Sequence, residues 1–597
     1  MPNITVNHQV LEYDSKIDKN LLSCLLRHGV LIENPCAGKG VCGKCKVQII
    51  GDCPITQAQS SLLKEEEIQA GIRLACMVEV YSDIEVILFE KERKHKILSD
   101  GYVPEFEFLP AVSKVCVQIK RASIEDQTPV EEQIRAQVGE VSIDYKVWQN
   151  FSFEAGTWTA VCIKEEDKTR VCALELGDTT KESYGLAIDI GTTTVVVSLI
   201  SLMDDKELGS ASAINAQKEM GLDVLSRITY ETEYPKEGKE KLQSTMVHSL
   251  NQLIEQVCNQ CDVSMERIYE AAIAANSTMM HMLLGIDART IGKSPYAPIF
   301  INSKNIKASQ IGLKVSSGAR IYTLPSVSAY IGADISAGAY VCGLHKTNDK
   351  ILFIDIGTNG EIVLSNKGKM LCCSCAAGPA LEGMNISCGM RAAEGAIEDV
   401  HITEEGVQLK VIGDTKPVGI CGSGILAVGR ELVRTGLLQK NGTFIKKEKL
   451  LKEDYRYPMI QMEGKKRNFV LSKSSNLMIT QSDIRQLQFA KGAILSGFLA
   501  LLNEAGIDMS ELNQVMIAGQ FGAHLSPDSL TGTGILPKEV EDKIVYVGNS
   551  SKTGAYMALM SVDARKELEE TAKKMRYMEL SNTKEYERLF ASCTLFE

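Results

Sequence analysis

Short alternations of apolar and polar residues open the chain and predict a small, β-rich domain with one helix. Two alternating runs flank a turn at Asn7 and His8, and a run with helical spacing follows, with Asp18 as its expected N-cap. Two more alternating runs come later in the first 90 residues. The expected elements are strands at 4–6, 10–13, 46–50 and 84–89 and a helix at 21–28.

The pattern changes twice more along the chain. Residues 90–96 are charged and have no apolar periodicity, so we expect a solvated linker at 91–110. A weaker zone holds strand-like runs and both tryptophans. From residue 184 onwards, apolar strands, Gly- and Thr-rich turns and long helical stretches follow one another, which is typical of an α/β domain. The expected domains are 1–90, a small middle domain at 111–180, and 181–597.

Composition narrows the possible functions. The 597 residues are 44% hydrophobic and 24% charged, which are ordinary values for a multidomain globular protein. The net charge of −11 argues against nucleic acid as the main partner. No apolar run reaches membrane-spanning length, and the first residues lack a basic segment followed by an apolar one. We therefore expect a cytoplasmic protein with no membrane partner.

Four cysteines in the first zone have the spacing of an iron–sulfur site. Cys36 is followed after five residues by Cys42, after two more by Cys45, and after 30 more by Cys76. Four thiolates can hold two bridged irons, and the glycines around the first three cysteines allow a tight loop whose N–H groups point at the sulfurs. A zinc site would more often show two CxxC pairs. The segment resembles the 2Fe-2S ferredoxins, which implies a β-grasp fold.

A second motif occurs twice. Residues 186–197 read LAIDIGTTTVVV and residues 352–363 read LFIDIGTNGEIV, which places Asp189 and Asp355 166 residues apart. In each copy a Gly turn between two strands offers N–H and hydroxyl groups to a phosphate, and the aspartate can hold Mg²⁺ through water. Two such hairpins facing each other across a cleft would bind the phosphates of ATP. The turn residues are Gly191, Thr192, Thr193 and Thr194 in the first copy and Gly357, Thr358, Asn359 and Gly360 in the second.

Glycine-rich turns near the end of the chain complete the pattern. Gly519 and Gly522 follow an apolar strand, where the absence of side chains would let an adenosine lie against the backbone. Two other Gly-rich stretches, 376–383 and 420–424, either border the nucleotide or turn a sheet corner.

The paired hairpins and the Gly519 turn together resemble the phosphate-1, phosphate-2 and adenosine motifs of the acetate and sugar kinase, Hsp70 and actin (ASKHA) superfamily. The resemblance implies a duplicated, actin-like ATPase fold with two α/β lobes around a nucleotide cleft. In that superfamily a carboxylate on the helix between the phosphate motifs serves as base or orients water. Asp334 matches this position, although it could equally cap its helix. The expected catalytic carboxylates are Asp189, Asp334 and Asp355.

A ferredoxin domain fused to an ATPase makes physical sense where electron transfer is uphill. The whole order of domains resembles the reductive activators of corrinoid-dependent methyltransferases, found in acetogenic and other anaerobic bacteria. That resemblance implies one-electron reduction of inactive Co(II) to Co(I) from a 2Fe-2S cluster, driven by ATP with Mg²⁺. It also implies a corrinoid (cobalamin-binding) protein as partner, an upstream low-potential electron donor and a homodimer.

Matching the motifs of that family to this sequence implies roles for single residues. Cys36, Cys42, Cys45 and Cys76 would hold the cluster; Asp189, Thr192, Thr193, Asp355, Thr358 and Asn359 would contact Mg²⁺ and phosphates; Gly519 and Gly522 would flank adenosine.

Two other functions stay open. An activase of the 2-hydroxyacyl-CoA dehydratase or benzoyl-CoA reductase kind also couples ATP to electron transfer. It places one four-iron cluster between two kinase-like subunits and needs no ferredoxin domain, so the N-terminal cysteines disfavour it. A redox-sensing binding protein that uses nucleotide only as a conformational switch is the other alternative.

Overall fold

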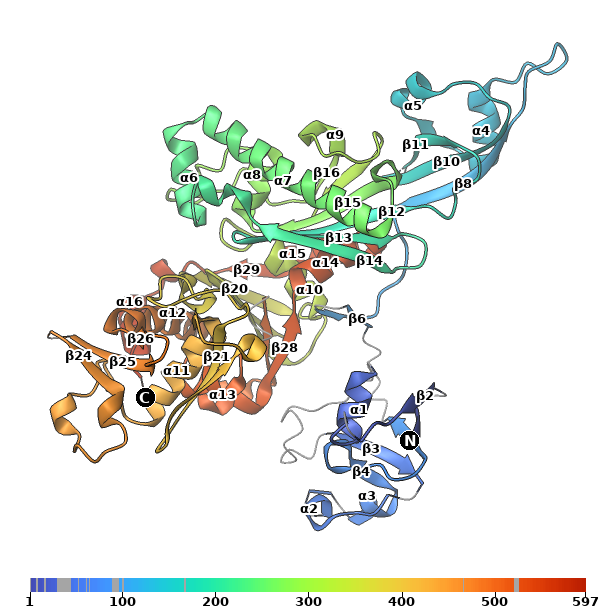
Figure 1. Ribbon diagram of the computed structural model, residues 1–597. Coiled ribbons are helices and arrows are strands. Elements are labelled where there is room, and N and C mark those ends of the chain that lie inside the picture. Colours follow the sequence, from blue (N-terminus) through green and yellow to red (C-terminus); the bar gives the residue numbers. More distant parts are fainter. Residues whose placement is uncertain are drawn as a thin grey trace. The chain divides into compact units, whose positions relative to one another are not determined.

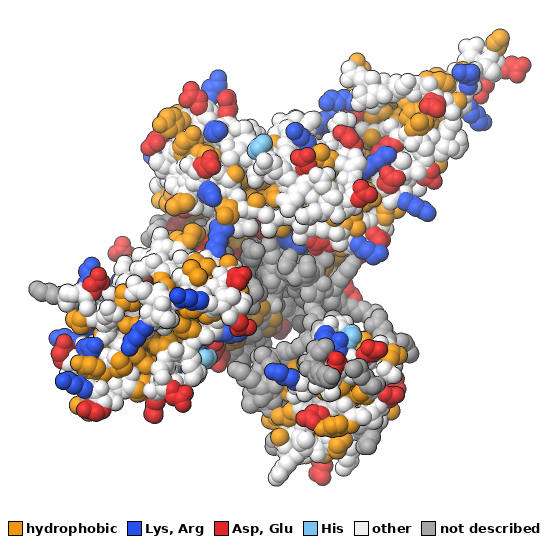
Figure 2. All heavy atoms as spheres, viewed as in Figure 1, with side chains coloured by type: hydrophobic (Ala, Val, Ile, Leu, Met, Phe, Trp, Pro, Cys, Tyr) orange, Lys and Arg blue, Asp and Glu red, His pale blue; other side chains and the backbone are white. Residues whose placement is uncertain are grey.

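The chain divides into two compact units, Met1–Lys94 and His95–Glu597 (Figure 1). The computed structural model describes residues 2–6, 9–15, 18–28, 45–51, 53–60, 62–63, 65–88, 96–98, 101–165, 168–464, 466–519 and 525–596. Over this part of the chain, no helix is both long and apolar enough to span a bilayer. Acidic and basic side chains are interspersed over the face seen in Figure 2.

The first unit is a five-stranded sheet in the order β2-β1-β5-β3-β4. Its central pair, β1 and β5, is parallel, and the other pairs are antiparallel. Alternate residues of β1 and β5 are buried, which agrees with the apolar alternation of the sequence. This confirms the expected β-grasp domain. Its elements are β1 (Asn3–Val6), β2 (Gln9–Glu12), α1 (Leu21–Arg27), β3 (Lys46–Ile50), α2 (Gln57–Ser60), α3 (Glu65–Gln69), β4 (Ile72–Leu74), η1 (Ala75–Met77) and β5 (Ile84–Leu88).

The N-terminus of α1 is capped by Asn20 and not, as expected, by Asp18. The Asn20 side chain accepts a hydrogen bond from the Ser23 N–H at 3.0 Å, and the Ser23 hydroxyl accepts one from the Asn20 N–H at 3.0 Å. Asp18 lies too early for this position and instead accepts a hydrogen bond from Arg27 at 2.6 Å. The expected turn at Asn7 and His8 lies outside the described residues.

The second unit contains a small four-stranded sheet in the order β8-β10-β11-β9. Its own apolar core contains Trp158, whose ring lies 5.0 Å from that of Phe151. The elements are β8 (Val112–Ile119), α4 (Val130–Val138), β9 (Ser142–Ile143), α5 (Tyr145–Asn150), β10 (Gly156–Glu165) and β11 (Lys168–Leu176).

Lobe I, residues 184–341, is built on a six-stranded sheet in the order β14-β13-β12-β15-β17-β16. Every residue of β15 is buried, as expected for a parallel strand covered on both faces. Its strands are β12 (Tyr184–Ile190), β13 (Thr194–Ser201), β14 (Glu207–Ile214), β15 (Ile268–Ala275), β16 (Lys304–Lys307) and β17 (Arg320–Thr323). Its helices are α6 (Val224–Glu233), α7 (Glu237–Cys261), α8 (Ser277–Leu284), α9 (Ala308–Ile311) and α10 (Ala333–Val341).

Lobe II, residues 350–596, supplies six strands of an eight-stranded main sheet in the order β29-β20-β19-β18-β27-β28-β7-β6; β6 and β7 come from earlier in the chain. It also has a small mixed sheet, β22-β21-β23, and a small antiparallel sheet, β24-β25-β26. Its strands are β18 (Lys350–Ile356), β19 (Gly360–Asn366), β20 (Lys369–Cys375), β21 (Ala396–Thr403), β22 (Gly406–Val411), β23 (Gly419–Ile420), β24 (Ile460–Glu463), β25 (Lys466–Ser472), β26 (Leu477–Ile479), β27 (Gln514–Ala518), β28 (Ile544–Gly548) and β29 (Met575–Tyr577). Its helices are α11 (Gly422–Arg434), α12 (Gln481–Ala505), α13 (Pro527–Gly532), α14 (Ser550–Met560), α15 (Val562–Lys574) and α16 (Tyr586–Cys593).

The two lobes repeat one topology, as the duplicated motif predicts. In each sheet an antiparallel meander, β12-β13-β14 or β18-β19-β20, continues through its first strand into a parallel pair, β12-β15 or β18-β27. A third parallel strand, β17 or β28, extends each sheet. The helices that follow these last strands, α10 and α14, pack against each other so closely that a Cβ on Gly554 would lie 2.5 Å from the Ala337 Cβ.

Part of the expected linker belongs to the second unit. Within 91–110, β6 (Lys96–Leu98) and β7 (Gly101–Val103) pair with each other, and Gly101 pairs with Gly548 of β28. Backbone hydrogen bonding of this kind requires no apolar side-chain pattern, so the sequence does not predict it.

Candidate functional site

The two expected hairpins form and carry equivalent turns. Asp189 and Asp355 are each the second-last residue of a strand, β12 or β18. The first turn is closed by a hydrogen bond from the Gly191 N–H to the Thr194 carbonyl (2.9 Å) and the second by one from the Gly357 N–H to the Asn359 carbonyl (3.0 Å). Thr194 and Gly360 then begin the return strands β13 and β19. We call residues 191–193 and 357–359 the phosphate loops.

Distant polar residues hold the first phosphate loop. The Arg227 guanidinium of α6 donates to the Thr192 carbonyl at 2.7 Å, and the Asn276 amide before α8 donates to the Thr192 hydroxyl at 3.0 Å. The Asn215 amide donates to the Gly191 carbonyl at 2.9 Å. Burial lowers the pKa of Arg227 to about 10. A fully buried cation therefore lies behind the turn that is expected to meet phosphates.

Asp189 receives hydrogen bonds from the other lobe. Asn549, just before α14, donates to one carboxylate oxygen at 2.9 Å, and the Ser551 hydroxyl donates to the other at 2.7 Å. The Asn549 oxygen also caps α14 by accepting from the Lys552 N–H at 2.9 Å. Burial nevertheless raises the pKa of Asp189, because desolvation outweighs these hydrogen bonds.

Asp334, Asp355 and Glu361 are half-buried near Asp189, and we call these four residues the acid cluster. Burial, with the charge of Asp189, raises the pKa of Asp355 to about 7. Burial, with the charges of Asp355 and Asp189, raises the pKa of Asp334 to about 7. Glu361 has its pKa raised well above the usual value by burial and by Asp334 and Asp355. Burial is the largest cause of each raised pKa, and for Asp334, Asp355 and Glu361 the charges of neighbouring acids add to it.

The structure shows that Asp334 is not the N-cap of its helix, and it adds Glu361 to the acids predicted from the sequence. Asp334 is not the N-cap of α10, which is Gly332; its carboxylate accepts from the Ile335 N–H at 2.9 Å within the first turn. Glu361 was not among the site residues predicted from the sequence, although only Gly360 separates it from the second phosphate loop. The matching residue of the first copy is Val195, so this acid is not part of the repeated motif.

The donor set fits Mg²⁺ held partly through water. Among the described residues, no three His, Cys, Asp or Glu side chains are arranged to ligate a metal ion directly. Mg²⁺ keeps several waters and binds through one or two carboxylates together with the phosphates of a nucleotide. Carboxylates at the ends of two strands, Asp189 in β12 and Asp355 in β18, match that mode of binding.

Gly519 lies against the end of β18, just before the second phosphate loop. Its φ is +95°, and a Cβ there would lie 2.7 Å from a carboxylate oxygen of Asp355 and 2.9 Å from the Ile356 carbonyl. The sequence predicts that this glycine borders adenosine, and in the structure it also lies close to Asp355, just before the second phosphate loop. Gly522 lies outside the described residues.

Two of the four cluster cysteines can be located. Cys45 precedes β3 and Cys76 lies in η1; both are buried, and their sulfurs are 3.2 Å apart. The Ala75 N–H donates to the Cys45 carbonyl at 2.8 Å, which ties the two segments together. Two buried thiols held side by side agree with the expectation that both are ligands of one iron–sulfur cluster. Cys36 and Cys42 lie outside the described residues.

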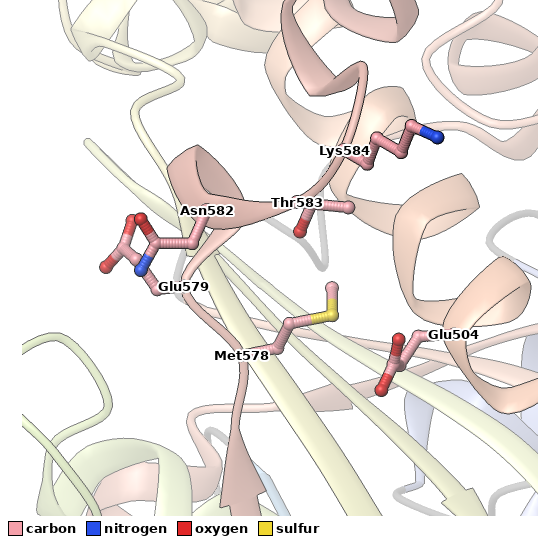
Figure 3. A pocket seen from close by; sticks show the side chains of 6 residues that line it. All are labelled: Glu504, Met578, Glu579, Asn582, Thr583 and Lys584. Atoms are coloured by element: carbon pink, nitrogen blue, oxygen red, sulfur yellow. The ribbon is translucent and has the colours of Figure 1, made fainter.

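Two surface hollows lie away from the phosphate loops. One, of about 450 Å³, is lined by six residues from the end of α12 and the segment after β29, and Figure 3 shows the Met578 side chain projecting among them. The other, of about 900 Å³, lies between the small sheet and lobe I and is lined by Lys146, Glu175 and Arg267 among others. Neither hollow contains a residue of the acid cluster.

Fold and site together define a class: an iron–sulfur β-grasp domain joined to a two-lobed, actin-like nucleotide-binding fold. Family models agree with this in three parts: a 2Fe-2S iron-sulfur cluster binding domain over 4–81, the RACo middle region over 184–347, and the C-terminal domain of RACo, the ASKHA domain, over 349–597. The RACo middle region thus corresponds to lobe I and not to the small sheet at 111–180.

Similar proteins cover from two thirds of the chain to all of it. The corrinoid activation enzyme RamQ of Eubacterium limosum is 30% identical over 548 residues, 89% of this chain and 88% of that protein. A Co(II) methylated amine-specific corrinoid protein reductase of Methanosarcina barkeri is 25% identical over 66% of this chain and 73% of its own. A solved structure named reductive activator for corrinoid,iron-sulfur protein has a TM-score of 0.76 and 32% identity, and covers 100% of this chain and 98% of that one. The chain belongs to the RACo family.

Proposed function

We propose that this protein reductively activates a corrinoid protein at the expense of ATP, by returning inactive Co(II) to Co(I) with one electron. The observation that carries the proposal is the joining, in one chain, of a ferredoxin-type cysteine site to a nucleotide fold with two facing phosphate loops. The names of the relatives from Eubacterium limosum and Methanosarcina barkeri support it, since both refer to corrinoid activation or reduction.

In the first unit, Cys36, Cys42, Cys45 and Cys76 would hold the 2Fe-2S cluster. When bound, the cluster would supply a single low-potential electron, near −400 mV in plant-type ferredoxins. The chain itself holds Cys45 and Cys76 side by side through the hydrogen bond between their segments. An upstream low-potential donor would have to return the electron after each turnover.

In the second unit, the phosphate loops would bind ATP from opposite lobes. Asp189 and Asp355 would hold Mg²⁺ through water, and Asp334 would take a proton from attacking water, for which a pKa of about 7 is well suited. Because the loops belong to different lobes, a nucleotide bound to both favours one lobe arrangement over others. Coupling of this kind can drive an electron transfer that is otherwise unfavourable.

Matched serine variants test the electron-transfer half. Cys45→Ser should abolish the oxidised 2Fe-2S absorption and the reduction of a cob(II)alamin protein, while MgATP binding stays intact. Cys53→Ser, in the same unit but outside the spacing pattern, is the control and should retain both. Reduction by the cluster-free Cys45→Ser protein would contradict the proposal.

An aspartate variant tests the nucleotide half. Asp189→Asn should keep the absorption spectrum and lose ATP-dependent reduction. Measuring phosphate release over many turnovers, with and without a corrinoid protein, distinguishes this activity from a nucleotide-switched binding protein, which would not turn over.

A further inference from the structure

Glu382 lies between the two phosphate loops, in one of the Gly-rich stretches that the motifs leave unassigned. It ends the 3₁₀ turn η4 (Pro379–Glu382) of lobe II and is 4% exposed. One carboxylate oxygen accepts from the Thr358 hydroxyl at 2.6 Å, and the other accepts from the Thr193 hydroxyl at 3.3 Å. A single carboxylate therefore receives a hydroxyl from each lobe.

The backbone around Glu382 is firmly held. Pro379 begins the turn and Gly383, with φ of +78°, ends it. The second Gly-rich stretch packs directly on this turn, because a Cβ on Gly422 at the start of α11 would lie 1.8 Å from the Leu381 carbonyl. Both stretches thus support the position of the Glu382 carboxylate.

The direction of these hydrogen bonds decides what the threonines can bind. A hydroxyl has one proton and two lone pairs. Thr193 and Thr358 give their protons to Glu382, so only lone pairs remain to face the cleft. Lone pairs attract a cation and repel phosphate oxygens. From the sequence we expect these residues to contact Mg²⁺ and phosphates, and this geometry favours the Mg²⁺ contact for the two hydroxyls.

We propose that Glu382 is a specificity-determining positioning residue, which orients the Thr193 and Thr358 hydroxyls as acceptors so that the site takes ATP only as a complex with a divalent cation. Phosphate oxygens would then be left to the backbone N–H groups of the loops. This inference rests on the proposed function, since it assumes that the cleft binds nucleotide.

Binding measurements with and without metal test it. The Kd of ATP is measured by calorimetry in excess Mg²⁺ and again with EDTA, for the full chain and for Glu382→Gln. The glutamine amide can donate to a threonine oxygen and so release a hydroxyl proton towards phosphate. The ratio of the Kd in EDTA to the Kd in Mg²⁺ should fall by about tenfold or more.

Glu231→Gln is the matched control, because Glu231 is also buried and accepts from a backbone N–H, that of Ala288, outside the site. Its ratio should equal that of the unmodified protein. An unchanged ratio in Glu382→Gln, or equal weakening under both conditions, would overturn the inference.

A second variant keeps the test decisive if Glu382→Gln does not fold. Thr193→Val preserves shape and removes the hydroxyl; it should weaken binding of MgATP and spare that of free ATP. Weakening of both would indicate direct phosphate contact and refute the proposed orientation. If the unmodified protein binds no MgATP at all, the proposed function itself fails, which is a different result from an unchanged ratio.

Discussion

Replacing Gly519 by alanine adds one carbon atom, the Cβ, which should displace the Asp355 carboxylate in the nucleotide site. The new Cβ would lie 2.7 Å from the Asp355 carboxylate, whereas Cβ contacts normally stay beyond 3.4 Å, so the carboxylate must move by about 0.7 Å. A misplacement of about 1 Å in a reacting group reduces activity by roughly a hundredfold. We therefore expect MgATP affinity or turnover to fall by about ten- to a hundredfold in Gly519→Ala.

The matched control is Gly506→Ala at the end of α12. Gly506 also has positive φ, +62°, but a Cβ there meets nothing within 4 Å. Each substitution should lower stability by about 1–2 kcal/mol through backbone strain. Calorimetric binding of MgATP and phosphate release compare the two variants, and the 2Fe-2S absorption confirms that the first unit is unaffected. Equal MgATP binding by both variants would refute the argument that Gly519 makes room for Asp355.

Two further variants probe single contacts. In Asn549→Ser the serine hydroxyl still caps α14 but no longer reaches Asp189. MgATP affinity should therefore fall, while the free energy of unfolding changes by under about 1 kcal/mol. MgATP binding equal to that of the unmodified protein would exclude a role for the Asn549 amide. His345 is buried and stacks on Tyr340, and burial lowers its pKa to about 4. Between about pH 6.5 and pH 4, His345 is therefore protonated in the unfolded chain and neutral in the folded chain. Stability should therefore fall by about 3 kcal/mol as pH drops from 6.5 to 4, and His345→Phe should show a shallower fall in denaturation midpoint over that range; identical pH profiles would contradict this.

Local features of the site were predictable from sequence. The strand–turn–strand hairpins around Asp189 and Asp355 form as expected, because a tight turn depends on a few adjacent residues and on the apolar runs that flank it. The β-grasp strands of the first unit follow their apolar alternation in the same way. The predicted N-cap Asp18 was wrong by two positions, since Asn20 caps α1. The strands β6 and β7 were not predicted, because their pairing depends on the backbone alone.

Residues that act across large sequence separations were not predictable. Arg227, Asn549 and Glu382 reach the phosphate loops from other elements, and no local pattern marks them as partners of Thr192, Asp189 or Thr193. The raised pKa values of the acid cluster likewise arise from shared burial.

The sequence by itself determined the kinds of chemistry: a four-cysteine spacing, two phosphate turns and the acids beside them. These are encoded by neighbouring residues, whose types and spacing are visible along the chain. Only the tertiary structure decided how the hydroxyls, carboxylates and buried cation are oriented, because hydrogen-bond direction and desolvation depend on which distant segments pack together. That orientation directs the hydroxyls of Thr193 and Thr358, one from each predicted phosphate turn, towards the single carboxylate of Glu382.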